Sequence, residues 1–246
     1  MNRLWKAIAV LMLMMIVVVG CTKPETPNNG GSHGGQNDSV VGNNGSLNGH
    51  DYVDLGLPSG TLWATCNVGA ETPEDYGDYF AWGETEPKDL YDWKSYKYGN
   101  CFTDRYELNK YCTDSVYGLN GFVDNLTVLE PADDAAMADW GVGWSVPTIE
   151  EWEELFEGTS NEWTTWNGAN GWLFTASNGK SMFLPVAGYW WDDVFNSGLG
   201  VYWSGSLQTD YPNRAWGFHF NPDSAHLCGS SDRNRGQTIR PVCTRQ

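Results

Sequence analysis

A sharp break in composition near residue 50 limits where this chain can build a folded core. Residues 22–50 consist mostly of Asn, Gly, Ser, Pro and Thr, whereas all but one of the 14 tryptophans lie in residues 51–246. A segment with so few apolar side chains cannot bury enough surface to offset the entropy lost on ordering. We therefore expect a disordered tether over residues 21–50 and one folded domain over residues 51–246.

The amino terminus has the order of a secretory signal. Two basic residues precede an apolar run over residues 7–19, which leads into Val18-Val19-Gly20-Cys21. The run is shorter than the ~20 residues that a bilayer-spanning helix needs. Its last four residues resemble the lipobox of bacterial lipoproteins, whose cysteine is lipidated and whose chain is cut before that cysteine. The resemblance implies a signal peptide over residues 1–20 and a lipid anchor on Cys21.

Export to the cell envelope follows from that interpretation, with the outer membrane as the expected site. The alternative is an ordinary signal peptide followed by an incidental cysteine. Lipoproteins that reach the cell surface often carry an acidic cluster just after the lipidated cysteine, and Thr22-Lys23-Pro24-Glu25 lacks one. The membrane face on which the domain lies is therefore left open.

The charge of the chain restricts its partners. Its formal net charge is −17 at pH 7. Nucleic-acid phosphates and anionic lipid heads both require clustered Lys and Arg, so neither is an expected ligand. The membrane is expected as a partner through the lipid alone, and the other expected partner is a glycan or an envelope protein.

Five cysteines follow the proposed anchor, and their odd number leaves at least one thiol unpaired in a monomer. The pairings nearest in the sequence are Cys101–Cys112 and Cys228–Cys243, with Cys66 remaining, but the sequence does not fix connectivity. The chain contains no CxxC, and no Cys/His spacing resembles a zinc site. We predict no metal and no cofactor.

Two segments have helical patterns. The second segment covers residues 149–157. Thr148 and Glu151 form the [ST]-x-x-E capping-box signature at its start, apolar residues recur on one face, and Gly158 is a candidate carboxyl cap. The first, residues 132–140, is rich in Ala, begins with two aspartates and ends at Gly141.

The remaining pattern is that of short strands separated by long turns. Candidates before the helices are residues 52–63 and 64–70, while residues 76–83 read as a strand or an irregular aromatic core. Candidates after them are residues 172–175, 181–185, 201–204, 215–220 and 238–242. Helices followed by a run of strands indicate an α+β fold with small antiparallel sheets.

Six segments occur in an order that resembles a known family. They are YVDLGLPSGTLWATCNVGA (52–70), YGDYFAWGET (76–85), WSVPTIEEWEEL (144–155), FLPVAGY (183–189), GVYWSGS (200–206) and IRPV (239–242). Together they are similar to the Fibrobacter succinogenes major paralogous domain, which is abundant in Bacteroidetes lipoproteins. The resemblance covers residues 51–246 and implies a C-type-lectin-like fold related to the formylglycine-generating-enzyme scaffold. Because a fold does not define a function, the site has to be argued from residues.

The preferred candidate site is the segment that follows FLPVAGY. Trp190 and Trp191 are adjacent, so on a strand they point to opposite faces, and one can pack in the core while the other stacks on a sugar ring. Asp192, Asp193 and Asn196 are candidates to bind hydroxyl groups or to hold a cation. The alternative is a pair of packed tryptophans beside a solvated acidic turn.

Other candidates carry weaker patterns. Trp163 and Trp166, near two asparagines, form a second aromatic and polar cluster. The segment Asn221-Pro222-Asp223 partly resembles the calcium loop of C-type lectins, but it is also good turn chemistry. Nucleophilic catalysis needs a nucleophile, a base and an orienting group. No such set stands out, although a carboxylate pair is not excluded by sequence, and we predict no catalytic residue.

The sequence thus favours a non-catalytic, envelope-anchored module for ligand binding, with carbohydrate binding or adhesion as the expected role. A structural component of a surface appendage or complex is the second hypothesis. An enzyme built on the formylglycine-generating-enzyme scaffold, using Cys228 and Cys243, is the third.

Overall fold

The computed structural model describes residues 45–103 and 105–244. The predicted signal peptide, Cys21 and the tether as far as residue 44 lie outside the described residues. Residues 45–50, which the composition assigns to the tether, instead form β1 (Gly45–Leu47) and the start of β2 (His50–Val53). Leu47 explains this early start, because its side chain packs against Trp144 and its carbonyl accepts a hydrogen bond from Trp144 Nε1 at 3.0 Å.

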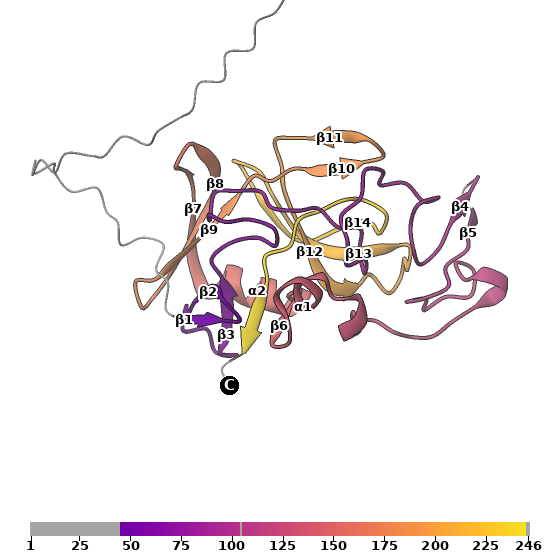
Figure 1. The fold of residues 1–246 in the computed structure, drawn as a ribbon, viewed down its shortest axis with the longest axis horizontal. Coiled ribbons are helices and arrows are strands. Elements are labelled where there is room, and N and C mark those ends of the chain that lie inside the picture. Colours follow the sequence, from indigo (N-terminus) through magenta and orange to yellow (C-terminus); the bar gives the residue numbers. More distant parts are fainter. Residues whose placement is uncertain (1–44, 104, 245–246) are drawn as a thin grey trace, which may run out of the picture. The chain divides into compact units, whose positions relative to one another are not determined.

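The fold is α+β, as predicted (Figure 1). Within the described part of the chain, two α-helices accompany small sheets whose paired strands are antiparallel. The largest sheet has the order β1, β2, β3 (Thr61–Ala64), β15 (Val242–Thr244) and β6 (Trp144–Ser145). Pairing of β15 with β3 brings the last described strand next to the start of the domain.

Four smaller sheets complete the described fold. Two have three strands each: β7 (Thr159–Trp166), β8 (Ala169–Ala176) and β9 (Ser181–Pro185), and then β12 (Gly200–Leu207), β13 (Arg214–Phe220) and β14 (Ala225–Asp232). Two are hairpins: β4 (Cys101–Phe102) with β5 (Arg105–Tyr106), and β10 (Tyr189–Trp191) with β11 (Val194–Asn196). Short 3-10 turns occupy Leu119–Gly121 and Pro131–Asp133.

Helix α2 (Ile149–Gly158) begins at the predicted capping box. The hydroxyl of Thr148 accepts from the Glu151 amide at 3.3 Å, and the Glu151 carboxylate accepts from the Thr148 amide at 2.8 Å. The predicted carboxyl cap at Gly158 is wrong, because the helix includes Gly158 and the cap is Thr159. The Thr159 hydroxyl donates to the Leu155 carbonyl at 2.7 Å, so the chain enters β7 without a left-handed residue.

Helix α1 (Ala135–Trp140) is shorter than predicted. Its amino cap is Asp134, whose carboxylate accepts from the Met137 amide at 3.0 Å, while Asp133 belongs to the preceding 3-10 turn and is buried. The predicted end at Gly141 is confirmed, with φ +87°, which favours glycine.

The predicted strands after the helices are confirmed with one exception. Residues 181–185 coincide with β9, and residues 172–175, 201–204 and 215–220 lie within β8, β12 and β13. The prediction for residues 238–242 is wrong except at Val242, where β15 starts. Side chains explain the exception, since Thr238 donates to the Tyr76 carbonyl at 2.8 Å and Arg240 donates to the Thr65 carbonyl at 2.7 Å.

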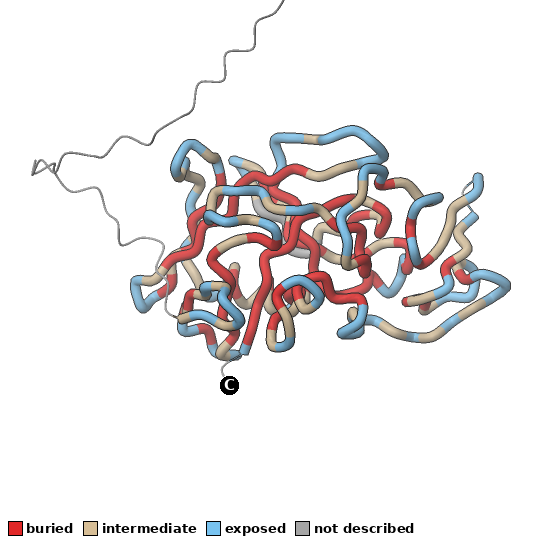
Figure 2. The backbone as a smooth tube through the Cα atoms, viewed as in Figure 1, coloured by how far each residue is buried: buried red, intermediate tan, exposed pale blue. Residues whose placement is uncertain are grey.

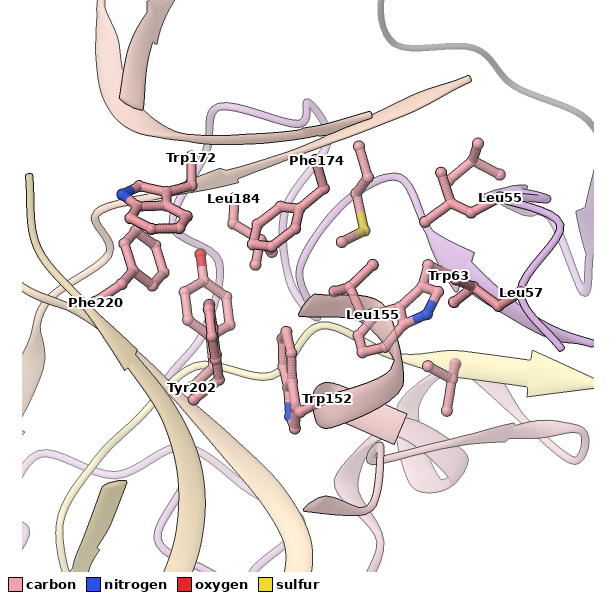
Figure 3. Packing of buried hydrophobic residues seen from close by; sticks show 14 of the residues in the cluster. Leu55, Leu57, Trp63, Trp152, Leu155, Trp172, Phe174, Leu184, Tyr202 and Phe220 are labelled. Carbon is pink, nitrogen blue, oxygen red and sulfur yellow. The ribbon is translucent and has the colours of Figure 1, made fainter. Parts of the chain in front are cut away.

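The main core forms where α2 meets the sheets (Figure 3). Trp152 is fully buried on the inner face of α2, with its ring 4.7 Å from that of Trp63 on β3 and stacked at 5.1 Å on Phe218 of β13. Leu155 and Phe174 extend the same cluster. These contacts hold the helix against all three larger sheets, which gives the loops between the strands a rigid base.

A second core cluster contains a buried arginine. Arg233 has no exposed surface and donates four hydrogen bonds: from Nε to the Tyr96 hydroxyl, from Nη1 to the carbonyls of Tyr111 and Pro212, and from Nη2 to the carbonyl of Lys110, all between 2.8 and 3.0 Å. Its guanidinium carbon lies 5.0 Å from the ring centroid of Trp82. Hydrogen bonds from all three guanidinium nitrogens make this buried charge tolerable.

Asp133 is the buried anion nearby. Its carboxylate accepts hydrogen bonds from Lys110 Nζ and the Tyr111 hydroxyl, each at 2.6 Å, and from the Tyr98 hydroxyl. Burial alone would raise the pKa of Asp133, but the hydrogen bonds from Lys110, Tyr111 and Tyr98 outweigh it and lower that pKa. The carboxylate therefore stabilises the folded state in its charged form.

Neither cysteine pairing nearest in the sequence is present as a disulfide, because Cys112 and Cys243 are both buried thiols. Burial raises the pKa of Cys243 to about 11. Between residues 45 and 244, leaving out residue 104, no helix has the length and apolarity to cross a bilayer.

Candidate functional site

The hairpin of β10 and β11 is fixed to the domain along its length. Trp190 exchanges backbone hydrogen bonds with Gly236, at 2.8 and 3.0 Å, and Asp192 exchanges them with Tyr91, at 3.0 and 3.2 Å. Within the hairpin, Trp190 is opposite Phe195. Although Figure 2 shows most of this hairpin as exposed, the backbone bonds of Trp190 and Asp192 hold the β10 side, which therefore presents its side chains from a rigid base.

The two adjacent tryptophans point to opposite faces, as predicted. Trp190 is half-buried and packs against the second core cluster, with its ring edge-on to Tyr79 at 6.4 Å. Trp191 is 50% exposed and lies beneath the guanidinium of Arg235, whose carbon is 4.5 Å from the ring centroid. One tryptophan therefore anchors the hairpin, and the other is available at the surface.

Tyr189 shares a strand face with Trp191, because side chains two residues apart on a strand point the same way. The guanidinium of Arg235 lies 5.6 Å from the Tyr189 ring, so one cation contacts both aromatic rings. Cation–π attraction at partly exposed positions is worth roughly 0.5–1 kcal/mol per pair. The two rings therefore hold the guanidinium in place without requiring a strong ion pair.

A cavity of about 200 Å³ lies beside this pair. Tyr189 and Leu199 form its apolar side together with Val201 of β12. Its polar side is formed by His219 of β13, Ser230 and Ser231 of β14, and Arg235. Four segments distant in sequence thus converge on one small concave surface, and none of the residues that line it is an aspartate or glutamate.

Arg235 keeps hydrogen-bonding capacity at this cavity. Its only ion pair among the described residues is with Asp232, at 3.6 Å between Nη2 and Oδ2, which is longer than a hydrogen bond. Its Nε is buried and has no hydrogen-bond partner within the described part of the chain. A buried donor of this kind costs free energy until an acceptor reaches it.

The predicted polar residues of the hairpin have smaller roles. Asp192 and Asp193 are exposed on the turn, and Asp192 has a left-handed backbone with φ +54°, which Asp tolerates. Asn196 donates from Nδ2 to the Val194 carbonyl at 3.1 Å, so its amide is turned toward its own hairpin. These three residues shape the turn and do not line the cavity.

The predicted second cluster does not join the site. Trp163 and Trp166 lie on β7, where Trp163 pairs with Trp172 and packs against the main core. Trp166 lies 6.4 Å from the ring of Phe183. Both are half-buried packing residues, and neither lines any of the three cavities described here.

The site residues that the sequence analysis missed are Tyr189, His219, Ser230, Ser231 and Arg235. Arg235 follows Arg233 in a short polar turn after β14, and no local pattern distinguishes the two arginines. Only the fold shows that one is enclosed and the other lies against Trp191.

Two other cavities have different chemistry. One, of about 680 Å³, lies between the loop of residues 69–79 and the turn of residues 167–169, where Asn167 donates to Glu74 at 2.9 Å. Another, of about 320 Å³, is lined by His50, Cys66 and Trp140 among others. His50 stacks on Trp140 with ring centroids 3.9 Å apart, and burial lowers its pKa. Of the three cavities, only the one at Arg235 combines a cation with an exposed aromatic ring beside it.

Metal-ligating groups are not gathered anywhere in the part of the chain that the structure describes, since no three His, Cys, Asp or Glu side chains there could hold an ion together. No protein-family model matches the sequence, and comparisons with curated proteins and with solved structures likewise find no match. The function therefore has to be proposed from the geometry of the site.

Proposed function

We propose that this chain is an envelope-anchored lipoprotein whose domain is a non-catalytic module for carbohydrate binding or adhesion. The observation that carries the proposal is the half-exposed Trp191, held against Arg235 at the cavity beside β10. Sugars are recognised by stacking on aromatic rings together with a few well-placed polar groups. This site offers an aromatic ring on the hairpin, and polar groups on β13, on β14 and at Arg235.

The chemistry of the cavity supports binding over catalysis. Its polar lining consists of two serines, a histidine and an arginine, without the carboxylate pair that a glycosidase uses. Burial raises the pKa of Cys243 to about 11, which makes that thiol a poor nucleophile at neutral pH. These observations weigh against the formylglycine-generating-enzyme alternative.

The proposed scaffold is C-type-lectin-like, as the resemblance to the Fibrobacter succinogenes major paralogous domain implies. The α+β arrangement, with two helices and small antiparallel sheets, is compatible with it. The hairpin that carries Trp191 lies between most of FLPVAGY and GVYWSGS, in a region where loops on a rigid scaffold commonly carry ligand contacts.

The anchoring part of the proposal rests on the lipobox-like residues that end in Cys21. In a bacterial host, the full chain should incorporate labelled palmitate and fractionate with membranes. The Cys21→Ser variant should lose both label and membrane association. Equal labelling of the two proteins would contradict the anchor.

The binding part is tested on the compact unit Asn37–Gln246, which contains all three core clusters. A broad glycan array in calcium buffer should give a selective signal that Trp191→Ala abolishes. Tyr211→Ala is the matched control, because Tyr211 is also exposed, at 54%, but, unlike Trp191, it is not the ring against which the cavity residue Arg235 lies. A blank array from folded protein, or equal loss in both variants, would contradict the proposal.

A second candidate function is assembly with an envelope protein, and one observation favours it. Trp191 and Val194 are opposite each other in the hairpin, and their side chains are 50% and 58% exposed. Contiguous exposed apolar side chains often mark protein contacts. If this role holds, Val194→Asp should abolish capture of an envelope partner while leaving sugar binding unchanged.

A further inference from the structure

The arginine at the cavity indicates which kind of saccharide it takes. Building on the proposed carbohydrate-binding role, we infer that the ligand is an acidic sugar of the uronic-acid class, whose carboxylate binds Arg235 while its ring contacts Trp191. Four features of the site support this class of ligand: the unpartnered Nε of Arg235, the absence of carboxylates among the lining residues, the contact of Arg235 with two aromatic rings, and the size of the cavity.

Arg235 has a hydrogen-bond donor that no described residue uses. Arg235 lines the cavity, its Nε is buried without a partner among the described residues, and its contact with Asp232 is 3.6 Å long. A guanidinium presents parallel N–H groups that match the two oxygens of a carboxylate. A neutral hydroxyl satisfies one of those donors, whereas a carboxylate satisfies two at once.

The charge around the cavity differs from that of the chain as a whole. The chain as a whole is strongly acidic, so a long-range field would repel an anion. That field is screened beyond about 8 Å at physiological salt, and the residues lining the cavity include no carboxylate. Recognition of an anion is therefore a local property of Arg235, and it should be selective because most of the surface disfavours anions.

The positions of Arg235 and Trp191 restrict the shape of the ligand. The guanidinium carbon lies 4.5 Å from the Trp191 ring centroid, while half of the Trp191 surface stays exposed. A ligand that uses both groups needs a compact ring with a carboxylate attached directly to it. A uronic acid has that form, since its carboxylate is borne on the pyranose ring carbon.

The volume of the cavity restricts the size of the ligand. The cavity measures about 200 Å³, which is below the ~300–1,000 Å³ of typical drug-sized sites. It therefore accepts one sugar residue or the end of a chain rather than a nucleotide or a folded peptide. Ser230 and Ser231 also line the cavity, and because adjacent strand residues point to opposite faces, one of the two hydroxyls is available for the remaining groups of the sugar.

The test uses matched pairs of methyl glycosides: glucuronide against glucoside, galacturonide against galactoside, and mannuronide against mannoside. Each pair differs only in a carboxylate or a hydroxymethyl group. Calorimetric titration of the compact unit should show at least one uronide binding about tenfold or more tightly than its neutral partner. Arg235→Gln should remove that preference.

Arg105→Gln is the matched control, because Arg105 is 71% exposed on β5 and does not line the cavity. It should keep the preference for the uronide. If the neutral glycosides bind as tightly as the uronides, or if Arg235→Gln changes nothing, the acidic-sugar inference is overturned while carbohydrate binding stands. If no glycoside binds, or if only a peptide carboxylate such as that of acetyl-Gly-Gly binds, both proposals fail.

Discussion

Arg233 and Arg235 lie two residues apart, and both stack on aromatic rings, yet their surroundings are opposite. Arg233 has no exposed surface and donates four hydrogen bonds inside the second core cluster. Arg235 faces a cavity, contacts Tyr189 and Trp191, and keeps an unpartnered Nε among the described residues. An arginine whose three nitrogens all donate hydrogen bonds is a structural element, whereas one with an unpartnered nitrogen beside an exposed ring is a candidate for binding.

The largest expected effect on stability is that of replacing Arg233, the enclosed arginine. Arg233→Met should lower the free energy of unfolding by about 3–5 kcal/mol, because the carbonyls of Lys110, Tyr111 and Pro212 lose their donor while remaining buried. Chemical denaturation followed by tryptophan fluorescence measures this change. A loss below about 1 kcal/mol would remove the contrast between the two arginines, since that is the scale of an ordinary surface substitution.

The contribution of the Asp133 carboxylate to stability should depend on pH. The folded-state pKa of Asp133 is lowered, so its contribution to stability is present above its unfolded pKa and is lost as pH falls through the folded value. Asp133→Asn should cost about 2–3 kcal/mol at neutral pH and progressively less in acid. Parallel denaturation curves for the two proteins across pH 2–7 test this, and a constant difference would contradict it.

The two adjacent tryptophans should separate stability from binding. Trp190→Ala should cost about 2 kcal/mol, because its ring packs on Tyr79 and Phe195 and supports the hairpin. Trp191→Ala should lower the free energy of unfolding by about 1 kcal/mol at most, the scale of its cation–π contact with Arg235, while removing the stacking surface. Thermal melts of both variants measure the difference, and equal losses would mean that Trp191 is a packing residue.

The smallest effect on stability is expected at Arg235. Arg235→Gln should lower the free energy of unfolding by about 1 kcal/mol at most, because its ion pair with Asp232 is long and partly exposed and only its cation–π contacts with Tyr189 and Trp191 are lost. The same denaturation assay decides this. A cost comparable to that of Arg233→Met would show that Arg235 is held for structure, and the proposed site would lose its basis.

Sequence patterns predicted the parts of this fold that depend on local chemistry. The capping box at Thr148 and the apolar face of α2 are set within a few residues, and both are confirmed. The polar strand β7 was missed, because it has no apolar alternation and forms by pairing with β8. Residues 238–241 were misassigned because Thr238 and Arg240 bond to loops distant in sequence.

The site was predictable only in part. Adjacent tryptophans on one strand must face opposite ways, so the sequence could indicate that one of Trp190 and Trp191 would be exposed. It could not indicate which one, nor that Arg235 from another segment would lie over Trp191, because that contact depends on the pairing of β10 with Gly236. The same lack of tertiary information placed Trp163 and Trp166 among the candidates.

The most direct test of the proposed site is nuclear magnetic resonance mapping on the nitrogen-15-labelled compact unit. The same matched methyl glycosides would be titrated while the indole signals of the tryptophans and the Nε signals of the arginines are followed. The proposed site predicts that a bound sugar shifts the signals of Trp191 and Arg235 and leaves those of Trp163, Trp166 and Arg233 in place. Shifts confined to Trp163 and Trp166, or no shift at Trp191 with any glycoside, would contradict it.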